Sequence, residues 1–162
     1  MFRIGILTAS DKGSRGERRD ESGELIQSLI AHFGTVIAYQ IVADDQMELQ
    51  QALCQMADKE QADLILTTGG TGLGPRDVTP EATLAVIDRQ VPGIPEAMRA
   101  KSLTITPRAM LSRATAGLRG RTLIVNLPGS PKGVKECLEV ILPTLQHGLE
   151  IMRGDATECA RS

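Results

Sequence analysis

The chain has 162 residues, of which 41% are hydrophobic and 23% are charged, and this usage is typical of a globular protein with a real core. Its 18 basic and 20 acidic residues give a formal net charge of −2, and aromatic residues make up only 2% of the chain. This balance argues against nucleic-acid binding, which draws on unopposed positive charge or on aromatic stacking platforms. No apolar stretch approaches the ~18–20 residues of a membrane span, and the N-terminus lacks a signal-peptide pattern, so we expect a cytoplasmic protein.

Strand and helix patterns alternate along the chain. Short apolar runs rich in β-branched residues predict strands at residues 2–8, 35–42, 63–68 and 121–127. Apolar residues at helical spacing predict helices over residues 24–33, 44–56, 81–88, 94–103 and 131–152. Thr79 and Ser130 each precede a proline, a pattern that predicts a helix N-cap followed by proline at the first helical position.

Two segments break this regularity. Residues 104–120 are interrupted by proline and glycine, and we expect a short helix at 108–112 followed by an edge strand. Pro143 should kink the last helix or split it in two, because proline lacks the amide hydrogen that the helix needs. We expect one domain over residues 1–153, followed by a polar tail over residues 154–162.

The cysteines and histidines give no sign of a metal site. Cys54, Cys137 and Cys159 lie far apart, without a C-x-x-C pair, and His32 and His147 fall in helical patterns away from them. We therefore expect reduced thiols and no zinc.

Alternating strands and helices predict an α/β protein with helices on both faces of a mostly parallel sheet. Ligands of such sheets bind in the crevice beyond the carboxyl ends of the strands. Four polar or glycine-rich loops follow predicted strands, and they begin at Ser10, Asp44, Gly69 and Pro128. The sequence therefore places a candidate site where these four loops meet.

The most informative of these loops is the segment Gly-Gly-Thr-Gly-Leu-Gly-Pro at residues 69–75, here called the glycine loop. Glycines allow backbone N–H groups to approach a phosphate closely, and the hydroxyls of Thr68 and Thr71 add donors. The loop has neither the Gly-Lys-Ser/Thr of a Walker loop nor the glycine spacing of the dinucleotide fingerprint. The alternative interpretation is a tight turn without a ligand.

Two acidic residues accompany this loop. Asp77 follows the glycines, and a carboxylate beside a phosphate would repel it unless a cation such as Mg²⁺ lies between them. Asp44, at the tip of another predicted strand, could share the same metal and phosphate. The alternative for both residues is a helix-capping acid.

The two remaining loops carry basic residues. Ser10 and Asp11 open a loop that contains Arg18 and Arg19, which are either solvated or part of a mobile lid over an anionic ligand. In the last loop, Ser130 and the free amides of the helix start can bind an anion, helped by Lys132.

Residues 67–72 and the segment Arg-Asp-Val-Thr-Pro-Glu-Ala-Thr at 76–83 resemble the signature of the molybdopterin adenylyltransferases, the MogA/MoaB group related to the G domains of gephyrin. The resemblance continues at residues 10–11, 20–23, 44, 111–113 and 126–132, and extends to about residue 152. It implies a three-layer α/β/α fold of the molybdopterin-binding type, assembled as trimers or hexamers.

The resemblance also implies an activity: Mg²⁺-dependent transfer of AMP from ATP to the terminal phosphate of molybdopterin, with release of pyrophosphate. A molybdenum insertase would then receive the product. By position, Asp44 and Asp77 match the family's catalytic acids, which we also expect to hold Mg²⁺. The expected substrate-binding residues are Ser10, Asp11, Thr68, Gly69, Gly70, Thr71, Gly72, Ser112, Pro128, Gly129, Ser130 and Lys132.

One departure from the family pattern leaves a second function open. Some members carry a longer segment late in the chain, whereas this sequence passes directly from residues 136–139 into Leu142 and Pro143. This compact form resembles the MoaB branch, some members of which look unable to adenylylate. The alternative is therefore a non-catalytic protein that binds molybdopterin or assists assembly.

Overall fold

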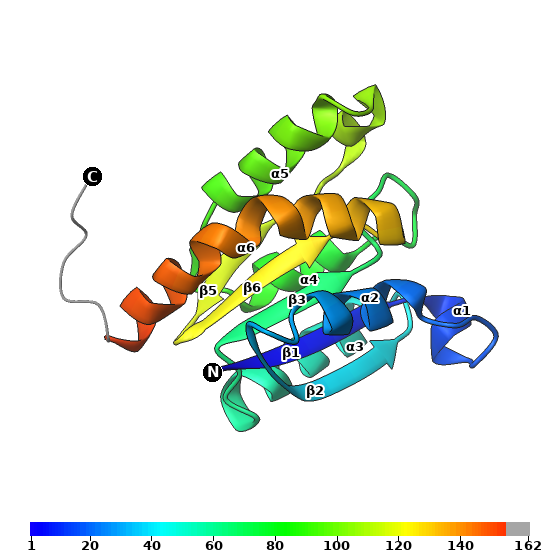
Figure 1. The fold of residues 1–162 in the computed structure, drawn as a ribbon. Coiled ribbons are helices and arrows are strands. Elements are labelled where there is room, and N and C mark those ends of the chain that lie inside the picture. The colour runs from blue at the N-terminus through cyan, green and yellow to red at the C-terminus, as the bar shows by residue number, and fades with distance from the viewer. Residues whose placement is uncertain (155–162) are drawn as a thin grey trace.

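The computed structural model describes residues 1–154, which form one six-stranded sheet with helices on both faces (Figure 1). The strands are β1 (Phe2–Ala9), β2 (Gly34–Val42), β3 (Leu64–Thr68), β4 (Arg89–Gln90), β5 (Ala116–Arg119) and β6 (Thr122–Leu127). Their order across the sheet is β2-β1-β3-β6-β5-β4. The four strands from β2 to β6 in this order are parallel, and β5 and β4 continue the sheet in antiparallel pairs. The mostly parallel α/β sheet predicted from the sequence is thus confirmed.

The helices lie in two layers. They are α1 (Asp11–Ser14), α2 (Glu21–Leu29), α3 (Gln46–Cys54), α4 (Thr79–Val86), α5 (Gly93–Leu103) and α6 (Pro131–Arg153). A π-helical turn (Gln55–Lys59) continues α3, and a 3-10 helix, η2 (Pro107–Leu111), follows α5. Helices α2, α5 and α6 pack on one face of the sheet, while α3 and α4 pack on the other (Figure 1).

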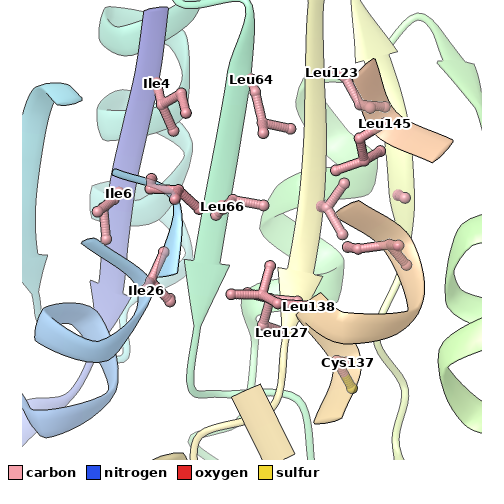
Figure 2. Packing of buried hydrophobic residues seen from close by; sticks show 14 of the residues in the cluster. Ile4, Ile6, Ile26, Leu64, Leu66, Leu123, Leu127, Cys137, Leu138 and Leu145 are labelled. Atoms are coloured by element: carbon pink, nitrogen blue, oxygen red, sulfur yellow. The ribbon is translucent and has the colours of Figure 1, made fainter. Parts of the chain in front are cut away.

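The core follows from the alternation of side chains along the strands. In Figure 2, Ile4 and Ile6 of β1 and Leu66 of β3 point to the same face of the sheet, toward Ile26 of α2 and Leu138 of α6. The intervening residues, such as Leu7 and Ile65, point to the opposite face and pack against α3 and α4. Because both faces are covered, the central strands are apolar throughout rather than alternating.

Helix starts were predicted with mixed success. Ser130 is the N-cap of α6, and its hydroxyl accepts a hydrogen bond from the amide of Gly133 at 3.1 Å. Thr79 is not a cap, because α4 has Val78 at its N-cap and Thr79 is the first helical residue. The Thr79 hydroxyl donates to the carbonyl oxygen of Gly69 at 2.9 Å, so this side chain ties the start of α4 to the glycine loop.

Other local predictions differ from the structure. The segment after Ser10, expected as a loop, begins with the short helix α1, whose N-cap is Ser10. The expected edge strand is β5, but β4 pairs with its outer side, so β5 is internal. Helix α6 runs through Pro143 as one element and is not split. Its last residue is Arg153, with Gly154 as the C-cap, and the rest of the predicted polar tail, with Cys159, lies outside the described residues.

Within residues 1–154, no helix has both the length and the apolar character needed to cross a membrane.

Candidate functional site

The loops that follow β1, β2, β3 and β6 meet at one end of the sheet, as expected for parallel strands. They enclose two cavities that share the glycine loop as a wall. We call one the acidic cavity, about 480 Å³ in volume and containing Asp44 and Asp77. The other, the helical cavity, measures about 520 Å³ and lies between α5, η2 and the start of α6. The sequence predicted one crevice where the four loops meet, and the structure has two adjoining cavities there.

The predicted site residues divide between the two cavities. Those that line the acidic cavity are Ser10, Asp44, Thr68, Gly69, Gly70, Asp77 and Gly129. Those that line the helical cavity are Thr71, Gly72, Ser112, Pro128, Ser130 and Lys132. Asp11 lines neither cavity, because its carboxylate pairs with Arg76 at 2.8 Å and accepts the amide of Asp44.

The first half of the glycine loop is shaped by its own close contacts. Gly69 and Gly70 have φ angles of +89° and +67°, a region that side chains rarely adopt. A Cβ atom at Gly69 would collide with the carbonyl oxygen of Ala9, and one at Gly70 would collide with the Thr79 hydroxyl. The tight-turn interpretation therefore accounts for these two glycines, and the same lack of side chains leaves bare backbone at the acidic cavity.

Asp77 supports the glycine loop rather than the following helix. Its carboxylate accepts a hydrogen bond from the amide of Gly74 at 2.8 Å, and α4 has no side-chain cap. Asp77 therefore makes no capping hydrogen bond to α4. The carboxylate is half-buried and faces the same cavity as Asp44.

Asp44 is likewise not a helix cap, since Asp45 caps α3 by accepting the amide of Glu48 at 3.0 Å. The backbone amide and carboxylate of Asp44 exchange two hydrogen bonds with the carboxylate and amide of Asp11, each 3.0 Å long. Burial raises the pKa of Asp44 above its usual range, and the nearby carboxylates of Asp11 and Asp77 add to this effect. By contrast, the guanidinium of Arg76 lowers the pKa of Asp11. A cation in the acidic cavity would therefore stabilise ionised Asp44.

The donor set fits a magnesium ion that is completed by a substrate. Mg²⁺ prefers oxygen ligands and is usually held by one or two carboxylates together with substrate phosphates. Asp44 and Asp77 supply two carboxylates to one cavity. In the part of the chain that the structure describes, no group of three or more His, Cys, Asp or Glu side chains could hold a metal ion, so phosphate oxygens would be needed.

Arg18 lines the acidic cavity. From the sequence, two interpretations of this residue were open: a solvated side chain, or part of a lid over an anionic ligand. Among residues 1–154, its side chain has no hydrogen-bond or ion-pair partner. The adjacent Arg19 pairs with Glu24 at 2.6 Å. A guanidinium that lines a cavity without a protein partner suits an anionic ligand.

Asp20 also lines the acidic cavity, although only the family resemblance pointed to it. Its carboxylate accepts hydrogen bonds from the hydroxyls of Thr8 and Tyr39 and from the amide of Gly23 at 3.0 Å. Burial and this carboxylate raise the pKa of Tyr39. Because its carboxylate oxygens already accept these hydrogen bonds, Asp20 forms part of the cavity wall and links β1, β2 and α2.

The fold is that of an α/β protein with two adjoining cavities at the carboxyl end of its parallel strands. Residues 5–147 match the family model described as "Probable molybdopterin binding domain", and the chain belongs to this family. It is 43% identical over 155 residues to a molybdopterin adenylyltransferase of Helicobacter pylori strain J99, a match that covers 94% of this chain and 88% of that protein.

Solved structures and a longer relative agree with this assignment. The molybdopterin biosynthesis enzyme MoaB from Thermus thermophilus is 55% identical, with a TM-score of 0.89 over 95% of this chain and 98% of that chain. Gephyrin of Dictyostelium discoideum is 42% identical over an alignment of 162 residues, and the alignment covers 93% of this chain but only 22% of gephyrin. The resemblance to the MogA/MoaB group, and the fold expected from it, are confirmed.

Proposed function

We propose that the protein is a molybdopterin adenylyltransferase, which transfers AMP from ATP to the terminal phosphate of molybdopterin and releases pyrophosphate. The observation that carries the proposal is the pair of cavities on either side of the glycine loop, one of which holds Asp44 and Asp77. Joining two anionic substrates requires two adjoining sites and a means to offset their charge. The names of the relatives at 43% identity support this reaction.

In this proposal the acidic cavity takes the triphosphate of ATP. Asp44 and Asp77 would hold Mg²⁺ against the phosphates, and the unpaired Arg18 would bind phosphate oxygens directly. The helical cavity takes molybdopterin. Apolar side chains such as Met98 line it beside Ser130 and Lys132, so it offers an apolar surface for a ring and donors for a phosphate.

The chemistry then needs no nucleophile from the protein. An oxygen of the molybdopterin phosphate attacks the α-phosphorus of ATP, and the bond from that phosphorus to the oxygen bridging the β-phosphate breaks, releasing pyrophosphate. Phosphoryl-type transfers depend mainly on positioning and on electrostatic stabilisation. When bound, Mg²⁺ supplies positive charge at the phosphates. Asp44 and Asp77 orient the reacting groups, and the backbone of the glycine loop lies between the two substrates.

The test is pyrophosphate release by purified protein supplied with molybdopterin and ATP, with the adenylylated pterin measured in parallel. We expect both products in equal amounts, and neither product when the divalent metal is omitted. The non-catalytic alternative rests on the compact form of the sequence at residues 136–143, which resembles the MoaB branch. Binding of molybdopterin without pyrophosphate release would favour that alternative over the adenylyltransferase.

We further propose that the protein assembles as a trimer, acts in the cytoplasm and passes its product to a molybdenum insertase, as the family resemblance implies. Exposed apolar side chains support an oligomer. Leu103, Ile105 and Met110, on and near α5 and η2, are 45%, 46% and 65% exposed in the single chain.

A further inference from the structure

Arg113 connects three parts of the site. It lies between η2 and β5, and its backbone amide donates to the carbonyl oxygen of Thr71 at 2.9 Å. Its guanidinium donates from Nε to the carbonyl oxygen of Gly72 at 2.7 Å and from Nη2 to that of Asp77 at 2.6 Å. Nη1 pairs with the carboxylate of Glu81 in α4. One residue thus holds both ends of segment 71–77 and the first turn of the next helix.

These contacts engage carbonyl groups of the loop that would repel an anion if they faced it. A backbone loop binds phosphate through N–H groups, while carbonyl oxygens that face the same anion repel it. The carbonyl oxygens of Thr71, Gly72 and Asp77 are all engaged by Arg113. Glu81 offsets the guanidinium charge, so the net effect on the loop is geometric rather than a local excess of positive charge.

The glycine loop has two separate anchors. Thr79 holds the first half, because its amide donates to the carbonyl oxygen of Gly70 at 3.1 Å and its hydroxyl to that of Gly69 at 2.9 Å. Arg113 holds the second half, which leads to Asp77. The carboxylate of Asp77 depends on this half as well, since it accepts the amide of Gly74. Loss of Arg113 would therefore release Asp77 while the backbone at Gly69 and Gly70 keeps its anchor.

We infer that Arg113 is a positioning residue of the proposed adenylyl transfer, which sets the second half of the glycine loop and the carboxylate of Asp77 for the reaction. The inference rests on the proposed function. The residue type matters because the planar guanidinium presents donors in a fixed fork, whereas a lysine ammonium is a single point with flexible direction. A lysine at this position keeps the charge and the pairing with Glu81 but cannot reach both carbonyl oxygens in the same geometry.

The experiment compares Arg113→Lys with the wild type in steady-state adenylylation. We expect kcat to fall on the order of 10²-fold, the scale of a ~1 Å misplacement of reacting groups. The KM for ATP should stay within roughly threefold, because the first half of the loop and Arg18 are intact. Hydrogen exchange should become faster at the amides of residues 72–74 and 76–77 and stay unchanged in β3.

Arg119→Lys is the matched control. Arg119 also donates to a backbone carbonyl oxygen, that of Val86 at 2.8 Å, and pairs with a carboxylate, that of Asp58 at 2.6 Å. Its side chain is 27% exposed, close to the 34% of Arg113, but it lies at the opposite end of the sheet. We expect Arg119→Lys to keep the wild-type kcat even if its thermal midpoint falls as far as that of Arg113→Lys.

Three results would overturn the inference while the proposed function stands: an unchanged kcat in Arg113→Lys, an equal loss in Arg119→Lys, or a loss that appears in KM alone. Gln at position 113 provides a second variant, and we expect it to lose at least as much kcat, since it keeps neither the fork nor the charge. A wild-type protein that binds both substrates without turnover would instead overturn the proposed function itself.

Discussion

Replacing Asp77 by Asn tests whether a charge at this position serves catalysis. The substitution keeps the size of the side chain and an oxygen that can accept the Gly74 amide, which lies 2.8 Å from the carboxylate. Only the negative charge is removed. A hydrogen bond to a charged acceptor exceeds a neutral one by about 1 kcal/mol, and Asp77 is half-buried, so the free energy of unfolding should fall by about 1 kcal/mol or less.

The expected effect on catalysis is larger. Loss of one electrostatic contact made in the transition state typically costs about 10²–10³ in rate, and a factor of 100 corresponds to about 2.7 kcal/mol. We therefore expect Asp77→Asn to lower kcat at least 100-fold, and the Mg²⁺ concentration for half-maximal rate to rise. Affinity for molybdopterin should change little, because the proposed site of that ligand is the helical cavity and the lost group is an acid.

The assay is pyrophosphate release at saturating molybdopterin, over a range of Mg²⁺ and ATP concentrations, with binding and thermal unfolding measured on the same preparations. Asp45→Asn is the matched control. It removes a charge from the neighbouring loop, Asn remains a good N-cap for α3, and Asp45 does not line the acidic cavity. A folded Asp77→Asn protein with near-normal turnover would refute the reasoning and leave Asp77 with the structural task of holding Gly74.

Three further predictions concern the acidic cavity and the assembly. Burial raises the pKa of Asp44 in the folded protein above its unfolded value, so the folded state favours the protonated carboxyl group. The resulting contribution to the free energy of unfolding is present at low pH and is lost as pH rises through the folded-state pKa. Asp44→Asn should therefore raise the denaturation midpoint relative to the wild type at neutral pH, but not at a pH below 3.8, the ordinary pKa of the group. Equal midpoints for the variant and the wild type at neutral pH would contradict this. Arg18→Ala should raise the KM for ATP about tenfold, which corresponds to the loss of one charge-assisted contact of about 1.4 kcal/mol. The control Arg89→Ala, on the exposed strand β4, should leave the KM unchanged. If the two variants had equal KM values, Arg18 would be a solvated residue without a role in ATP binding. Light scattering should give three times the 17.4 kDa mass of one chain, and a monomer mass at micromolar concentration would exclude the trimer.

Much of the fold could be predicted because its signals are local. The apolar runs that become β1, β3 and β6 are buried on both faces, and helix patterns separate them. Ser130 followed by proline marks the start of α6 correctly for the same reason. Thr79 shows the limit of local rules. The Thr-Pro pattern predicts a cap at Thr79, but Thr79 is the first helical residue of α4, and its hydroxyl donates to the carbonyl oxygen of Gly69 in the glycine loop.

The division of the site could not be predicted from the sequence. Spacing places the four loops at one end of a parallel sheet, but it does not give the order of the strands or the position of α5 beside the start of α6. Those two features decide that Gly70 and Thr71, which are neighbours in the chain, line different cavities. The family resemblance included Arg113 within residues 111–113, but its contacts could not be predicted, since its partners Gly72 and Asp77 lie 41 and 36 residues away.

The two cavities share the backbone of the glycine loop as a wall, and this limits how far the ligand binding of one cavity can be changed without affecting the other. We expect a substitution at Gly69 or Gly70 to act on both cavities, because an added Cβ collides with its neighbours and must move the backbone that the cavities share. Variants that separate the two functions must come from the outer walls instead: residues 18–22 for the acidic cavity, and α5 with η2 for the helical cavity. In proteins of this fold, sequence changes at these outer walls can therefore alter the specificity for one ligand while binding of the other is kept.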